Sequence, residues 1–235
     1  MKGFVFDLDN TLFDRYGTLT KIMIDNFERI RPYINPAYDA KLAAEHICFS
    51  DALYNCLGSW NDIYAHLVGS HFFNAKNIPG QKEAFAFMRE QFKKVAVEIP
   101  YTRELVSDIR AAGYKTGIIT NGTGDVQKSK LALLNFSDLF DEIIVSGDFA
   151  KEMGDELDRT YYKPNRAIFD EMAKRLGADN SELYYVGDSP TMDIQGAVNA
   201  GYVPVWIAVR SPWCSNTLPM PKLWYRSLEG IRELI

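Results

Sequence analysis

The feature that most constrains the fold is a regular alternation of strand-like and helix-like segments from Pro100 to Ile207. Apolar strands are predicted at 114–120, 142–145, 183–186 and 202–207, and helices at 101–112, 125–134, 164–176 and 192–200. Strands that alternate with helices form βαβ units, in which the strands run parallel to one another. The chain is therefore predicted to be an α/β protein built on a parallel sheet.

A further strand is predicted near the start of the chain, and it runs directly into two carboxylates. Residues 2–6 are mainly apolar, and Asp7 and Asp9 follow them. In an extended chain, residues two apart point to the same side, so these carboxylates are expected to share a small volume. Such a pair needs a cation or a shared proton. An Asx turn after the strand is an equally good explanation of this stretch alone.

A run of helices separates the first strand from the alternating region. Helices are predicted at 16–30, 40–49, 50–57, 60–73 and 81–99. We therefore expect a helical domain of residues 15–98, inserted into a core of residues 1–14 and 99–235. Towards the end of the chain, residues 210–225 are expected to be irregular and residues 228–235 to form a short helix.

Composition narrows the class of protein. The chain has 235 residues, of which 47% are hydrophobic and 24% charged, as in an ordinary soluble domain. A net charge of -5 predicts no basic surface for nucleic acid, and no apolar run is long enough to cross a bilayer. The first strand begins too early to leave room for a signal peptide, and the three cysteines form no Cys-x-x-Cys pair, so a cytoplasmic protein with reduced thiols is expected.

Polar residues follow the ends of several predicted strands, which is where ligands bind in open parallel sheets. The residues are Asp7, Asp9, Thr120, Asn121, Gly122, Lys163, Asp188 and Asp193. The Thr120 hydroxyl and the amides of Asn121 and Gly122 are suited to phosphate oxygens. Lys163 offers a compact positive charge, and Asp188 is a hard oxygen ligand of the kind that Mg²⁺ prefers. Each is an ordinary turn, helix start or loop residue when taken singly, but their shared edge indicates a site.

The order Asp7-x-Asp9, Thr120, Lys163 and Gly187-Asp188-x-x-x-x-Asp193 resembles the haloacid dehalogenase superfamily of phosphohydrolases. The resemblance extends from residue 3 to residue 207 and includes all four family motifs. It implies a Rossmann-like core with helices on both faces of the sheet, and a helical cap of the C1 type inserted after the first motif. The wording of the motifs is most similar to the subgroup of small nucleotidases and sugar-phosphate phosphatases.

The resemblance also implies a role for each polar residue. The implied catalytic residues are Asp7 as nucleophile, Asp9 as general acid and base, Thr120 and Lys163. The implied substrate-binding residues are Thr120, Asn121, Gly122 and Lys163. The implied Mg²⁺ ligands are Asp7, the backbone carbonyl of Asp9, and Asp188, with Asp193 supporting the site next to Lys163.

These roles predict a Mg²⁺-dependent phosphatase that hydrolyses a small phosphomonoester through an aspartyl phosphate. A nucleoside monophosphate or a sugar phosphate is the expected partner, with no nucleic acid or membrane, and the protein is expected to be a monomer or homodimer. Two alternatives within the family are a haloacid dehalogenase and a phosphomutase. The family's dehalogenases lack an acid at the position of Asp9, and a phosphomutase needs a second phosphate site, for which residues 15–98 contain no recognisable residues. A non-catalytic interaction protein is a further alternative, which the presence of Asp7, Asp9 and Lys163 disfavours.

One segment departs from the family's usual length. Residues 147–162 form a longer connection than usual before Lys163, and the segment is charged and irregular in sequence. We expect it to be a solvated loop near the rim of the site.

Overall fold

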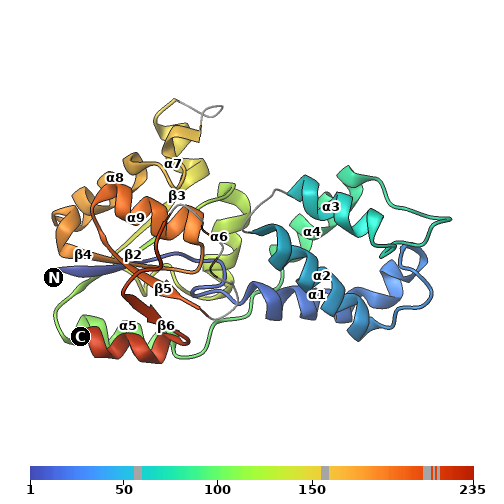
Figure 1. Ribbon diagram of the computed structural model, residues 1–235, viewed down its shortest axis with the longest axis horizontal. Coiled ribbons are helices and arrows are strands. Elements are labelled where there is room, and N and C mark those ends of the chain that lie inside the picture. The colour runs from blue at the N-terminus through green and yellow to red at the C-terminus, as the bar shows by residue number, and fades with distance from the viewer. Residues whose placement is uncertain (56–59, 155–158, 209–212, 214, 216–217) are drawn as a thin grey trace. The chain divides into compact units, whose positions relative to one another are not determined.

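Figure 1 shows a computed structural model of the chain, which describes residues 1–55, 60–154, 159–208, 213, 215 and 218–235. The chain divides into two compact units. One consists of Met1–Asp14 with Glu98–Ile235, and the other of Arg15–Val97. We refer to them as the sheet unit and the helical unit. Two of the three cysteines, Cys56 and Cys214, lie outside the described residues, and the Cys48 thiol donates to the Tyr16 carbonyl at 3.6 Å.

The sheet unit is built on six parallel strands, which confirms the predicted α/β fold. The strands are β1 (Gly3–Phe6), β2 (Lys115–Thr120), β3 (Glu142–Val145), β4 (Leu183–Gly187), β5 (Val203–Ile207) and β6 (Leu223–Tyr225). Their order in the sheet is β3-β2-β1-β4-β5-β6. Phe6, the last residue of β1, pairs with Ile118 on one side and Val186 on the other. The residues that follow β1 therefore emerge between the ends of β2 and β4.

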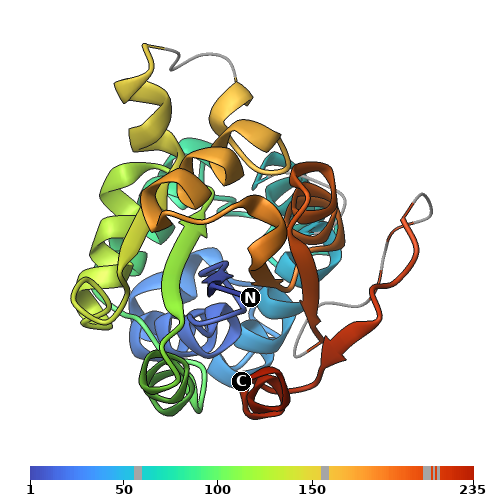
Figure 2. The same ribbon diagram turned by 90° about the vertical axis from the view of Figure 1, so that its left-hand side faces the viewer.

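Helices cover both faces of this sheet (Figures 1 and 2). They are α5 (Thr102–Ala111), α6 (Gly124–Leu133), α7 (Ser146–Glu152), α8 (Arg166–Leu176) and α9 (Gln195–Ala200). Val5 packs in a cluster with Phe169 and Met172 of α8 on one face. Phe4 and Phe6 point to the other face, where their rings contact Tyr114 and Phe140. Full burial of all four residues of β1 explains why this strand is apolar throughout.

The helical unit contains α1 (Arg15–Ile30), α2 (Ala40–Asn55), α3 (Trp60–Gly69) and α4 (Gln81–Phe92). Within it, the Arg15 guanidinium donates from Nε and Nη2 to the two carboxylate oxygens of Asp51, both at 2.8 Å. The two helices predicted at 40–49 and 50–57 are one helix as far as residue 55. The Ser50 hydroxyl donates to the carbonyl of His46 one turn earlier, so this serine continues the helix instead of ending it.

Several other boundaries differ from the sequence expectation. Helix α8 begins at Arg166 instead of 164, because Asn165 is its N-cap and has an extended backbone. The helix predicted at 192–200 is a π-helical turn, Pro190–Ile194, followed by α9. The helix predicted to reach residue 99 ends at Phe92. Strand β6 was predicted to be irregular, because three residues at a sheet edge are too few to produce a period.

The expectation of a solvated loop at 147–162 is wrong for its first part. Helix α7 occupies Ser146–Glu152, and Arg159–Tyr161 is a 3-10 turn, while residues 155–158 lie outside the described part. The Phe149 ring is buried in the core cluster and lies edge-on to Tyr161 at 5.1 Å. Because this segment is rich in charged residues, the sequence pattern did not indicate that Phe149 would anchor a helix to the core.

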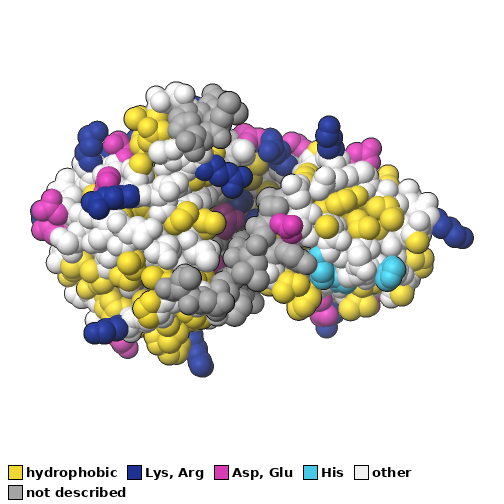
Figure 3. Space-filling view, turned by 45° about the horizontal axis from the view of Figure 1, so that its top comes forward, with side chains coloured by type: hydrophobic (Ala, Val, Ile, Leu, Met, Phe, Trp, Pro, Cys, Tyr) yellow, Lys and Arg dark blue, Asp and Glu magenta, His cyan; other side chains and the backbone are white. Residues whose placement is uncertain are grey.

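None of the helices in the described ranges is both long enough and apolar enough to cross a bilayer. On the face drawn in Figure 3, basic and acidic side chains of the described residues are interspersed among neutral ones.

Phe149→Ala tests whether α7 belongs to the core. We expect a loss of about 3 kcal/mol in the free energy of unfolding, since the ring leaves a cavity, and a melting temperature lower by roughly 6–12 °C. Met153→Ala, at an exposed position one turn further on, should stay within about 0.5 kcal/mol of the wild type. Equal, small effects from both substitutions would contradict the packing described for α7.

Candidate active site

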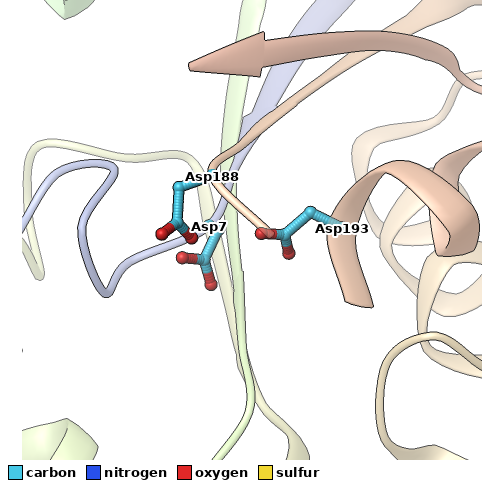
Figure 4. A group of neighbouring side chains, drawn as sticks. All are labelled: Asp7, Asp188 and Asp193. Atoms are coloured by element: carbon cyan, nitrogen blue, oxygen red, sulfur yellow. The ribbon is translucent and has the colours of Figure 1, made fainter. Parts of the chain in front are cut away.

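Three aspartates converge at the carboxyl edge of the sheet (Figure 4). Asp7 follows β1, and its N–H donates to the Val186 carbonyl at 2.9 Å, as though continuing the strand. Asp188 follows β4, and Asp193 comes from the π-helical turn. Oxygen atoms of the three buried carboxylates lie within 4.8 Å of one another. The approach of Asp193 requires glycine at position 187, because a Cβ there would lie 2.5 Å from the Asp193 Cβ.

A buried lysine ties this group together. The Lys163 Nζ lies 2.5 Å from Asp7 Oδ1 and 2.7 Å from Asp193 Oδ1. It is also 3.0 Å from the Tyr185 hydroxyl and 3.1 Å from the Ile119 carbonyl. An ammonium carries three protons, so four acceptors compete for them. The two carboxylates have the shortest contacts and hold the lysine, while the other two acceptors share its remaining proton.

Burial and neighbouring charges shift the protonation of this group. Burial raises the pKa of Asp7 to about 7, and the charges of Asp193 and Asp9 act in the same direction, while Lys163 opposes them. Burial would by itself lower the pKa of Lys163, but Asp193 and Asp7 raise it well above its usual value. Burial also raises the pKa of Tyr185, whose hydroxyl therefore stays protonated. Lys163 is thus a permanent cation between two carboxylates.

The Thr120-Asn121-Gly122 segment begins at the last residue of β2, which lies on the other side of β1 from β4. The Asn121 amide forms two reciprocal hydrogen bonds with the backbone of Lys163, each 2.9 Å long. The Gly122 N–H donates to the Ser146 hydroxyl at 3.0 Å. Asn121 therefore positions the lysine through its side chain, a role that the sequence did not suggest. The Gly122 amide is already committed, and could hold a phosphate oxygen only if the bond to Ser146 broke.

Asp9 faces helix α6. Its Oδ1 accepts from Lys130 Nζ at 2.6 Å and its Oδ2 from Gln127 Nε2 at 2.9 Å. The same Gln127 nitrogen lies 2.6 Å from Thr120 Oγ1. Because an amide nitrogen only donates, the Thr120 hydroxyl accepts this bond and keeps its own proton for another partner.

Asp9 lies close enough for its charge to raise the pKa of Asp7, and a different lysine holds each carboxylate. Strand β1 ends at Phe6, so Asp9 lies beyond the extended strand. Beyond this point the chain turns, with Asn10 at φ +60° and the N–H of Leu12 donating to the Leu8 carbonyl at 3.0 Å.

The sequence analysis missed several residues that contact the predicted site, among them Gln127, Lys130 and Tyr185. The available signal was weak. Gln127 and Lys130 lie three residues apart in a helix, and a polar pair with that spacing is usually solvated. Here both side chains are buried, with 3% of each residue exposed. Tyr185 is an ordinary strand residue in sequence, and only the fold places its hydroxyl beside Lys163.

The donor set suits a divalent cation. When all are ionised, three carboxylates and one ammonium leave two negative charges at the site, and carboxylate oxygens are the ligands that Mg²⁺ prefers. Asp193 uses Oδ1 to accept from Lys163 and Oδ2 to accept from the Ser189 N–H at 2.9 Å. We therefore expect Asp7 and Asp188 to be the better ligands, and Asp193 to hold the lysine.

The chain is similar in sequence and in fold to known hydrolases. Residues 1–201 match the family model described as haloacid dehalogenase-like hydrolase. The glyceraldehyde 3-phosphate phosphatase of Methanothermobacter thermautotrophicus is 36% identical over 86% of this chain and 83% of its own length. The pyrimidine 5'-nucleotidase YjjG of Escherichia coli is 33% identical over 48% of this chain and 46% of its own. The HAD-hydrolase YfnB of Bacillus subtilis, in a crystal form bound to magnesium, has a TM-score of 0.70 with 20% identity, covering 99% of this chain and 97% of that one.

The metal-binding capacity of the three aspartates can be tested without any assay of activity. In protein treated with a chelator, Mg²⁺ at about a hundred times its dissociation constant should add about 2.7 kcal/mol of stability, or roughly 5–10 °C in melting temperature. Asp188→Asn should remove most of this shift, whereas Asp138→Asn, at an exposed carboxylate of the same unit, should keep it. A shift of the same size in both variants would place the cation elsewhere.

Proposed function

We propose that this chain, which belongs to the haloacid dehalogenase-like hydrolase family and is a phosphatase of that family, hydrolyses a small phosphomonoester through a phosphorylated Asp7. The observation that carries the proposal is the buried Lys163, held between Asp7 and Asp193 beside Asp188. This cluster offers a nucleophile, a fixed positive charge and a set of metal ligands within one small volume.

Asp7 is the proposed nucleophile. One of its carboxylate oxygens forms a bond to phosphorus, and the bond from phosphorus to the leaving oxygen breaks. Asp9 gives its proton to that oxygen, which leaves as an alcohol. In the second step Asp9 takes a proton from water, the water oxygen attacks phosphorus, and inorganic phosphate leaves as the Asp7 carboxylate is restored.

The charge of the phosphate must be offset before a carboxylate can attack it. Mg²⁺, when bound by Asp7, the Asp9 carbonyl and Asp188, would supply positive charge and orient the phosphate. Lys163 adds a charge that does not depend on the cation. Its three protons serve four acceptors, so a phosphate oxygen can replace one of the two longer contacts without loss of the carboxylates. The Thr120 hydroxyl, which accepts from Gln127, can donate its proton to a second phosphate oxygen.

The substrate class is a sugar phosphate or a nucleoside monophosphate. The first choice is supported by the relative named as a glyceraldehyde 3-phosphate phosphatase, which aligns over most of both chains. The second is supported by the similarity to a pyrimidine 5'-nucleotidase, over about half of each chain. We propose that the helical unit, Arg15–Val97, acts as a cap whose side chains select between them. Asp9 argues for phosphate esters over haloacids, because a departing halide needs no proton.

A panel of phosphorylated metabolites tests the substrate class and the metal together. We expect phosphate release from triose and other sugar phosphates or from nucleoside monophosphates, lost on chelation and restored by Mg²⁺. Ca²⁺ should inhibit, since its larger and looser coordination shell suits in-line attack poorly. Full activity in metal-free enzyme would contradict the metal requirement. Activity confined to a folded phosphoprotein would contradict the small-molecule assignment.

Two substitutions separate the proposed roles of the aspartates. Asp7→Asn should abolish turnover of every substrate. Asp9→Asn should slow the first step about 10²- to 10⁴-fold for an alkyl phosphate, whose leaving oxygen needs a proton. It should slow that step much less for nitrophenyl phosphate, which loses a stable anion, so a burst of nitrophenolate should precede a slow steady state. Equal losses on both substrates, with no burst, would show that Asp9 is not the proton shuttle.

A further inference from the structure

Helix α6 presents two buried donors to one carboxylate. Gln127 and Lys130 are three residues apart and therefore lie on the same side of the helix. Each donates to a different oxygen of Asp9, so the carboxylate is held at both ends, by contacts of 2.6 Å and 2.9 Å. A carboxylate held at one oxygen can still turn about that contact, whereas one held at two has a fixed plane.

Both donors are themselves held in place. The Gln127 Nε2 also contacts Thr120 Oγ1 at 2.6 Å and the Asn121 carbonyl at 3.3 Å. The Lys130 Nζ lies 4.6 Å from the centre of the Phe13 ring, a cation–π contact. Phe13 is fully buried at the end of the loop that carries Asp9. Residues of helix α6 therefore contact both the Asp9 carboxylate and Phe13, which belongs to the loop that carries Asp9.

This fixation leaves Asp9 accessible. Its side chain is 24% exposed, against 8% for Asp7, although Lys130 beside it is almost completely buried. A proton donor must meet the leaving oxygen at hydrogen-bond distance, and displacement of a catalytic group by about 1 Å can cost about 10²-fold in rate. A leaving group can reach Asp9 only through the exposed part of its carboxylate. The hydrogen bonds to the two oxygens fix the orientation of this exposed part.

We propose that Lys130 and Gln127 are positioning residues that orient the Asp9 carboxylate for proton transfer to and from the reacting oxygens. This inference rests on the proposed function. In this role, neither residue contacts the reacting atoms of the substrate. Substitution of Lys130 gives the clearer test. Gln127 also contacts Thr120, so substitution of Gln127 should weaken phosphate binding as well.

Lys130→Met keeps the length of the side chain and removes the donor. We expect it to slow the first turnover of an alkyl phosphate by roughly 10- to 100-fold, and that of nitrophenyl phosphate by no more than about 3-fold. Lys128→Met is the matched control, since this lysine is on the same helix, is exposed and pairs with Asp148 at 2.8 Å. The control should match the wild type on both substrates.

A double-mutant cycle with Asp9→Asn separates positioning from a structural role. If Lys130 acts through Asp9, adding Lys130→Met to Asp9→Asn should slow the alkyl phosphate by less than about 2-fold further, because the group being positioned is gone. Equal losses of the single variant on both substrates would overturn the inference. So would a full, additive loss in the double variant, which would mean that Lys130 supports the fold or binds phosphate.

Lys130→Arg covers the case in which Lys130→Met fails to fold. Its guanidinium also donates to Asp9 but from a wider head group, so we expect a smaller loss that still depends on the leaving group. Equal losses on both substrates with this variant would again overturn the inference. Failure of the proposed function gives a different result, because the wild type itself would then release no phosphate from either substrate.

Discussion

The site depends on one buried cation between two carboxylates. An ammonium or a carboxylate removed from water is costly by itself, and removal of either partner leaves the other uncompensated. Lys163, Asp7 and Asp193 compensate one another, and they come from three separate parts of the chain. The parallel sheet brings these parts to one edge, and glycine at position 187 permits the close approach of Asp193.

A second lysine gives the two aspartates separate partners. Lys163 holds Asp7 deep in the site, while Lys130 and Gln127 hold Asp9 at a more exposed position. Two carboxylates that are so close in sequence would otherwise compete for the same cation or proton. Separate partners allow one carboxylate to serve as nucleophile and the other to exchange protons, as the proposed reaction requires.

The sequence predicted the parts of the fold that rest on a repeated local signal. The parallel sheet and the helical insertion followed from long periodic segments, and the grouping of Asp7, Asp188 and Lys163 followed from their places after strands or before a helix. Short elements gave no such signal: β6 has three residues, and α7 is anchored by Phe149 among charged neighbours. The partners of Asp9 could not be predicted, because only the packing of α6 makes Gln127 and Lys130 buried donors.

In the proposed reaction, Asp7 becomes phosphorylated during turnover. Rapid acid quenching of the enzyme during turnover of a substrate, followed by peptide mass analysis, tests it most directly. We expect a phosphoryl group at Asp7, found on the peptide that contains this residue, which accumulates in Asp9→Asn and is absent in Asp7→Asn. A phosphoryl group on another residue, or turnover with no phosphoenzyme in either the wild type or Asp9→Asn, would contradict it.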